Sequence, residues 1–236
     1  MSSEPAAINA PRVVMLLIGL FVAIHIGRGL LDRETGNLLL VMFSFIPVRY
    51  AGIEGLVIPG GDGAAVWSFV TYQFLHGSWM HLTVNSVWML AFASPVAWRL
   101  GVWRFLSFSV LCGMAGAATH LLFHWGEATP VIGASAAISG QMAGALRFVF
   151  QAGGPLGIMS DRSRSGVFVP ALGIGQMLQN RQVLLFLAVW IGLNLFMGMT
   201  GAMLDPQMAS VAWEAHLGGL AAGIVLFGLF DPVRRR

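Results

Sequence analysis

The sequence has very little charge and contains no lysine. Asp, Glu, Lys and Arg make up 10% of its 236 residues, whereas hydrophobic residues make up 57%. A soluble domain places roughly a quarter of its residues in the charged class. A soluble fold of this length would also have to enclose several apolar runs of about twenty residues in one small core, which surface-to-volume scaling does not allow. The composition therefore excludes a soluble globular protein and predicts an integral membrane protein.

Cysteine is nearly absent, and positive charge is not concentrated. The single cysteine, Cys112, lies in an apolar run, so no intrachain disulfide is possible. The sequence pI of 10.0 rests on 13 arginines. These arginines fall between the apolar runs rather than on one basic face, which argues against a nucleic-acid-binding protein.

Six apolar runs are long enough to cross about 30 Å of hydrocarbon as α-helices. The pattern predicts an all-α integral membrane protein whose six-helix domain covers residues 13–230. A short cytoplasmic segment at 1–12 precedes this domain, and a basic tail at 231–236 follows it. The first run is interpreted as a span and not as a signal peptide, because no small-x-small cleavage site follows it. The six runs cover residues 13–31, 79–98, 102–123, 130–150, 182–200 and 211–230.

Arginine predicts the orientation of these spans, because short cytoplasmic loops collect positive charge. With six spans, ten arginines fall on the side of the two termini and three fall on the other side. Both termini are therefore predicted to be cytoplasmic. The ten are Arg12, Arg99, Arg104, Arg147, Arg162, Arg164, Arg181, Arg234, Arg235 and Arg236, and the three are Arg28, Arg33 and Arg49.

Two connections between spans are long. The predicted outer loop at 32–78 has short apolar stretches broken by Pro47 and Pro59 and flanked by Trp67 and Tyr72, so we expect it to lie partly in the membrane interface. The predicted inner loop at 151–181 contains GGPLG and SDRSRSG. It is interpreted as a flexible cytoplasmic loop without recognisable chemistry.

Polar residues inside spans are costly and therefore informative. In the predicted topology the second, fourth and sixth spans begin at the outer face, and four polar residues lie near these beginnings. At about 1.5 Å per residue, all four would lie roughly 4–10 Å below the outer boundary. Three separate helices are thus expected to bring them to one level. The four are His81, Asn85, Ser135 and His216.

Ser135 lies in a run of small residues, which by itself is better explained by helix packing than by catalysis. The sixth span shifts the balance, because small residues form a smooth stripe beside His216. A helix packed on this stripe would bring Ser135 within hydrogen-bond reach of His216, and a neutral imidazole could then take the serine proton. The residues expected to allow close packing at the site are Gly133, Ala215, Gly219 and Gly223.

His81 and Asn85 are spaced i, i+4, so both project N–H donors from one helix face. Two donors held in a dry site can stabilise the oxyanion of a tetrahedral intermediate. The alternative is a polar pair that only joins helices. Glu214 is two positions from His216 and points to another face of the helix, so we predict a Ser–His dyad and not a triad.

Taken together, three motifs resemble those of the rhomboid intramembrane serine proteases. They are FLHGSWMHLTVN at 74–85, GASAAISG at 133–140 and AHLGGLAAG at 215–223. The resemblance covers residues 13–230 and implies a six-transmembrane-helix rhomboid-like bundle. It also implies Ser135 as the nucleophile, His216 as the general base, and His81, Asn85 and the Ser135 backbone N–H as the oxyanion-binding groups.

The chain departs from the family pattern at three places. The family usually has glycine after the nucleophile, where this chain has Ala136, which adds a methyl group beside the site. A Trp-Arg pair common in the first outer loop is here Trp67-Ser68. Where some members have an aromatic residue one turn after the nucleophile, this chain has Ser139.

The implied substrates are transmembrane segments of other proteins. An intact helix shields its carbonyls, so cleavage is expected where a segment unwinds easily, near small residues and helix breakers. Membrane lipid is the other expected partner, and no cofactor, metal or nucleic acid is expected. The three terminal arginines, with both ends inside, suit a bacterial inner membrane with the active site near the periplasmic face, and an organellar membrane is the alternative.

Two other functions are compatible with parts of the sequence. A metal-dependent membrane enzyme would use His120 and His124, which are spaced i, i+4, but no glutamate stands between them as in HExxH, and interfacial polar residues are the favoured interpretation. A catalytically inactive rhomboid-like protein that binds membrane clients would be expected to lack the nucleophile or the base. This chain keeps both, and Ala136 is the main feature in favour of that alternative.

Overall fold

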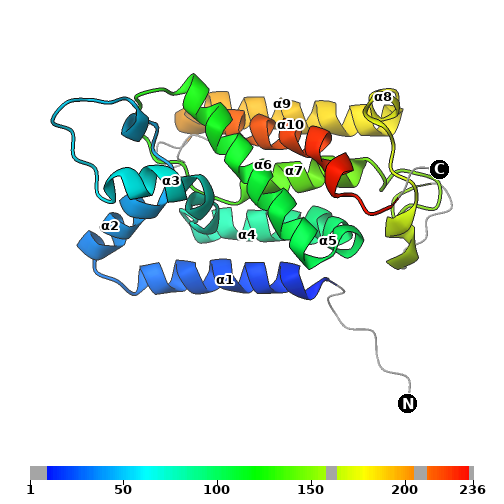
Figure 1. Cartoon of the computed structure of the whole chain (residues 1–236), viewed down its shortest axis with the longest axis horizontal. Helices are drawn as coiled ribbons and strands as arrows, with labels where there is room; N and C mark the ends of the chain where they lie inside the picture. Colours follow the sequence, from blue (N-terminus) through cyan, green and yellow to red (C-terminus); the bar gives the residue numbers. More distant parts are fainter. Residues whose placement is uncertain (1–9, 158–163, 205–211, 234–236) are drawn as a thin grey trace, which may run out of the picture.

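The computed structural model describes residues 10–157, 164–204 and 212–233, and these form a helical bundle (Figure 1). Within these ranges the only β-type pairing is an isolated antiparallel bridge between Phe45 and Val131. The described residues are therefore mostly helical and contain no strand. Several arginines used above to predict orientation lie outside the described residues, namely Arg162, Arg234, Arg235 and Arg236.

Four helices are long and apolar enough to cross a membrane by length and composition. They are α1 (Arg12–Gly29), α6 (Val102–Phe123), α9 (Arg181–Leu204) and α10 (Trp213–Phe230). Each follows one of the apolar runs in the sequence closely. Local hydrophobicity alone defines these four helices, because each run is long and contains no proline.

The second apolar run forms a helix with a widened turn in its middle. It consists of α4 (Trp79–Trp88), a π-helical turn η3 (Met89–Ala93) and α5 (Ser94–Leu100). Pro95 lies at the start of α5, and its missing N–H disrupts the regular hydrogen-bond ladder of the turn before it. The chain is nevertheless helical throughout residues 79–100.

The fourth apolar run is not one long helix, and the prediction of a span over 130–150 was wrong at both ends. Its helix, α7, covers only Ser135–Leu146, 12 residues, which is about 18 Å and too short to cross the hydrocarbon. Before α7, Val131 pairs with Phe45, and Gly133 has a φ of 117°, which is not helical. Every residue of α7 after Ser135 is buried, so this apolar segment is the interior of the bundle.

The long first connection contains two helices, α2 (Arg33–Phe43) and α3 (Gly61–Thr71), and two short 3-10 turns, η1 (Pro47–Tyr50) and η2 (Tyr72–Phe74). Trp67 Nε1 donates to the Met42 carbonyl at 2.9 Å, and Thr71 Oγ1 donates to the Phe43 carbonyl at 2.8 Å, so α3 is fastened to the end of α2. Both helices lie at one end of the bundle, called the α3 end below (Figure 1).

The opposite end of the bundle contains η4 (Arg164–Phe168) and α8 (Ile174–Met177) (Figure 1). Buried Arg99 holds this end together. Its guanidinium pairs with Asp231 at 2.8 Å and also donates to the carbonyls of Val167 and Val169. Because Arg99 is only 2% exposed, its buried charge needs these partners.

Helices α6, α7 and α10 pack against one another at the centre of the bundle, and glycines set their spacing. A methyl group added at Gly219 of α10 would collide with the Ala136 carbonyl of α7, and one added at Gly223 would collide with the backbone of Gly140. These two helices therefore touch through their backbones. The contact begins at the first turn of α7 and positions the residues described next.

Candidate active site

Ser135 and His216 lie within hydrogen-bond distance of each other. Ser135 Oγ is 2.6 Å from His216 Nε2, although 81 residues separate them in the chain. Ser135 is the first residue of α7, and His216 lies in the first turn of α10. Both side chains are partly exposed. The two helices thus bring a hydroxyl and an imidazole together at the α3 end of the bundle.

The glycines of α10 explain why this distance is so short. Gly219 lies one turn after His216 and rests directly on the Ala136 carbonyl. Any side chain at Gly219 would push α10 away from α7 and separate the two reacting groups. Gly116 of α6 plays a similar part on the other side, because a methyl group there would lie 2.5 Å from the Ala136 methyl and 2.6 Å from the Ala215 carbonyl.

His216 has a second partner, Asn194 of α9. His216 Nδ1 lies 2.6 Å from Asn194 Oδ1, and Asn194 Nδ2 donates to the Trp190 carbonyl at 2.9 Å. Because the amide nitrogen of Asn194 is used in this way, its amide oxygen faces the imidazole. This oxygen can only accept a hydrogen bond. Nδ1 must then carry the proton, and the Nε2 lone pair is free to accept the Ser135 hydroxyl.

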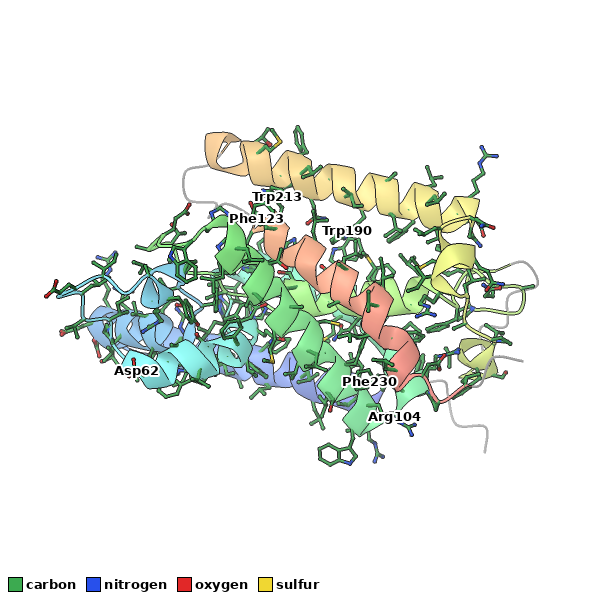
Figure 2. The ribbon with its side chains drawn as sticks, turned by 45° about the horizontal axis from the view of Figure 1, so that its top comes forward. Asp62, Arg104, Phe123, Trp190, Trp213 and Phe230 are labelled. Atoms are coloured by element: carbon green, nitrogen blue, oxygen red, sulfur yellow. The ribbon has the colours of Figure 1, made fainter. Side chains whose placement is uncertain are left out.

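The sequence pattern did not predict Asn194. The sequence predicts a Ser–His pair without a third residue, because the acidic residue near His216, Glu214, points to another face of its helix. A polar residue in the middle of the apolar run at 182–200 was the available signal, since such residues usually have a function or a partner. The Trp190 ring, 6.4 Å from the imidazole ring, occupies the space between α9 and α10 (Figure 2).

His81 and Asn85 lie on α4 beside Gly133. A Cβ atom at Gly133 would be 2.6 Å from His81 Nε2, so a glycine leaves the room that the His81 ring needs, and Asn85 Nδ2 would lie at an ordinary contact distance of 3.7 Å. The positive φ of Gly133 requires glycine for a second reason. Ser78 caps α4 by accepting from the His81 backbone N–H at 3.1 Å. The side chains of His81 and Asn85 therefore lie beside Gly133, which comes two residues before Ser135 in the chain.

The start of α7 supplies further donors. The first N–H groups of an α-helix have no acceptor within the helix, and they point out of its N-terminus. Ser135 is the first residue of α7, so its own backbone N–H belongs to this group. Gly133, which lies next to the side chains of His81 and Asn85, comes two residues before this amide.

The three departures from the family pattern have structural counterparts. The Ala136 methyl faces Gly116 of α6, and Ala136 is 1% exposed, so the extra carbon is accommodated in the core. Ser139 Oγ donates to the Ser135 carbonyl at 2.7 Å. Ser68 is buried, and its hydroxyl lies 3.4 Å from the Tyr50 hydroxyl.

The sequence was compared with models of known protein families. Residues 63–231 match the family described as Rhomboid domain, which is well over half of the chain. The chain belongs to the rhomboid family. No curated protein matches it significantly. Members of the rhomboid family are typically intramembrane serine proteases, and inactive members also exist.

The rhomboid match contains every residue of the site described above, including Asn194. It begins at Gly63 in α3 and therefore leaves out α1 and α2. In this rhomboid the arrangement can perform acyl transfer, because a nucleophile, a base, a group that orients the base and nearby N–H donors occur together.

Proposed function

We propose that this rhomboid protein is an intramembrane serine endopeptidase in which Ser135 and His216 cleave peptide bonds. The distance of 2.6 Å between Ser135 Oγ and His216 Nε2 carries the proposal. A serine hydroxyl is a weak nucleophile unless an adjacent base accepts its proton. The family match supports the same reaction class.

The reaction would follow the usual two steps of acyl transfer. Ser135 Oγ attacks the substrate carbonyl while His216 Nε2 takes the hydroxyl proton, and the protonated imidazole then gives this proton to the leaving amine. In the second step His216 Nε2 takes a proton from a water molecule while the water oxygen attacks the acyl ester. The bond between the acyl carbon and Ser135 Oγ then breaks, the new carboxyl product leaves, and the imidazolium gives its proton to Ser135 Oγ. Asn194 keeps the imidazole in the tautomer that both steps require.

The negative charge formed in each step would be stabilised by His81, Asn85 and the Ser135 backbone N–H. Electrostatic stabilisation of this kind is usually the largest single contribution to catalysis. Gly133 supports this role, because it brings the start of α7 next to both side chains. No cofactor enters either step.

The topology proposed here has six crossings and both termini in the cytoplasm. Four helices are long and apolar enough to span, and residues 79–100 form a fifth helical stretch of similar length. The sixth crossing would be the segment at 130–150, in which non-helical residues extend the short α7, because irregular backbone is tolerated at membrane depth where protein encloses it. The Arg12 end of α1 and the Phe230 end of α10 lie at the same end of the bundle, which supports an even number of crossings (Figure 1).

With this topology the site would lie near the periplasmic face of a bacterial inner membrane. The substrates would be transmembrane segments whose helices unwind easily, because a carbonyl must leave its helical hydrogen bond before Ser135 can attack it. Surrounding lipid would present these segments to the protein from the side.

Labelling with a fluorophosphonate tests the proposal directly. The purified protein is treated with the reagent, and the adduct is located by peptide mass. We expect the adduct on Ser135. Ser135→Ala and His216→Ala should each abolish cleavage of a single-span test substrate, while the amount of protein in the membrane fraction stays unchanged. Continued cleavage by either variant, or an unlabelled Ser135, would contradict the assignment and favour a client-binding protein without catalysis.

A further inference from the structure

A second group of ionisable side chains lies at the α3 end of the bundle, where α6 ends and α10 begins. His120 and His124 come from the last turn of α6 and the residue that caps it, and Glu214 comes from the first turn of α10. One ligand atom from each of the three residues lies within 4.8 Å of the other two. Figure 2 shows where the helix ends meet, at the neighbouring labels of Phe123 and Trp213, whose rings are 6.3 Å apart.

Two of these three side chains are buried, and both histidines face the carboxylate of Glu214. The side chains of His120 and Glu214 are each 8% exposed. His120 Nδ1 lies 3.8 Å from Glu214 Oε2, which is too far for a hydrogen bond, and it has no other partner among the described residues. His124 Nε2 lies 3.1 Å from Glu214 Oε1, at ion-pair distance. Two imidazole nitrogens thus converge on one buried carboxylate, and a buried nitrogen without a partner, such as His120 Nδ1, is costly.

We propose that His120 Nδ1, His124 Nε2 and the Glu214 carboxylate bind a Zn²⁺ ion. Two histidines and one glutamate are a known donor set for zinc with an open fourth position. Zinc bonds of about 2.0–2.1 Å in a tetrahedral site place ligand atoms about 3.3 Å apart. The separations of 3.1 and 3.8 Å to the carboxylate oxygens lie on either side of this value. Hard cations such as Mg²⁺ and Ca²⁺ prefer all-oxygen sites and suit this set poorly.

Glu127 supplies an outer partner that metal-bound histidines usually have. Its Oε1 lies 3.1 Å from His124 Nδ1, so this carboxylate accepts the proton on Nδ1 and leaves Nε2 free to coordinate. The negative charges of Glu214 and Glu127 would also attract a metal cation.

The proposed metal is separate from the reacting pair. Both ring nitrogens of His216 already have partners, Ser135 and Asn194, so His216 has no nitrogen left for the metal. The metal would instead tie the end of α6 to the turn of α10 that carries His216. The metal would therefore stabilise the contact between α6 and α10, and it would take no part in bond cleavage.

Metal titration of the full-length protein, purified without a polyhistidine tag, tests this site. We expect a single saturable site for Zn²⁺, and Co²⁺ in its place should give the intense visible bands of tetrahedral coordination. Binding of Zn²⁺ should also raise the melting temperature, since a ligand that binds only the folded state stabilises it. All of these measurements can be made in the Ser135→Ala background, so they do not depend on proteolytic activity.

Three variants separate the proposed site from other histidines. His124→Ala removes a ligand and should abolish both the Co²⁺ bands and the Zn²⁺-dependent rise in melting temperature. Glu127→Gln keeps all ligands and should weaken Zn²⁺ binding by roughly tenfold to a hundredfold. His25→Ala is the control, because His25 lies on α1 against Trp79, and it should bind Zn²⁺ like the unaltered protein.

Three results would overturn the zinc site. One is the absence of saturable Zn²⁺ binding to the unaltered protein. Another is equal binding by the unaltered protein and by both the His124→Ala and Glu127→Gln variants. The third is a weak, octahedral Co²⁺ spectrum, which would reject a tetrahedral site with these three ligands. None of these results bears on whether Ser135 and His216 cleave substrates.

Discussion

Ser135 and His216 are carried by helices that touch through their backbones, whereas Asn194 is carried by a helix that touches its neighbours through side chains. Gly219 and Gly223 of α10 rest on backbone atoms of α7. On α9, Gly192 has nothing within 4 Å of the place a side chain would occupy, and Gly198 meets only the Trp213 ring. In the 18-residue apolar stretch of α9, 17% of the residues are buried, against 44% in the corresponding stretch of α6.

Because of this difference, larger side chains are expected to be tolerated on one side of the site and not on the other. On the α7 and α10 side, an added carbon has no space, because densely packed backbones cannot move apart without losing contacts. On the α9 side, exposed positions such as Gly192 have space for larger side chains, and Asn194 supplies the polar contact to His216. Backbone contacts thus fix the positions of Ser135 and His216, while Asn194, which contacts His216, comes from a loosely packed helix.

The largest effect is expected from filling the backbone contact. Gly219→Leu should lower fluorophosphonate labelling and substrate cleavage below detection, because the leucine side chain must separate α10 from α7. The matched control is Gly192→Leu, the same change on the open face of α9, which should keep near-normal activity. Similar activity of the two variants would show that backbone contact does not position the site.

Asn85→Ala probes a polar group on the densely packed side. We expect kcat to fall roughly tenfold to a thousandfold, the range for losing one oxyanion donor, with little change in KM. The neighbouring Ser86→Ala is the control, since the Ser86 hydroxyl donates to the Leu82 carbonyl within its own helix. If the rate is unchanged, Asn85 has no part in binding the oxyanion.

Asn194→Ala probes the polar contact on the loosely packed side. The imidazole would lose the hydrogen bond that holds its ring in position and selects its tautomer. We expect kcat to fall by roughly tenfold to a hundredfold, as for modest misplacement of a catalytic group, with KM unchanged. Leu193→Ala changes the adjacent exposed residue and should have no effect. Equal activity of the two variants would make the Asn194 contact incidental.

The smallest effect is expected at the contact between α6 and the start of α7. Gly116→Ala places a methyl group 2.5 Å from the Ala136 methyl, and this overpacking should lower stability by about 1–3 kcal/mol. Adding Ala136→Gly removes the opposing methyl and should recover part of the loss, because the Ala215 carbonyl still lies close. Denaturation midpoints of both single variants and the double variant measure the coupling. If the two changes in stability simply add, the methyl groups at positions 116 and 136 do not contact each other.

The sequence by itself determined the membrane class, the family and the approximate course of most helices. A run such as 102–123 contains its own information, since each apolar residue favours lipid whatever its neighbours are. The order of the three polar motifs likewise predicted the family that the match over residues 63–231 confirms. Such features depend on residues that are close in the chain, so they can be read from it directly.

Only the tertiary structure decided how long α7 is and which residues surround His216. The run at 130–150 is apolar because it is enclosed by protein, which hydrophobicity cannot distinguish from enclosure by lipid. Asn194 is 22 residues from His216, and Glu214 meets His120 and His124 across two helices. These contacts depend on how closely the helices approach, and glycines such as Gly219 set that distance only once the partner backbone is known.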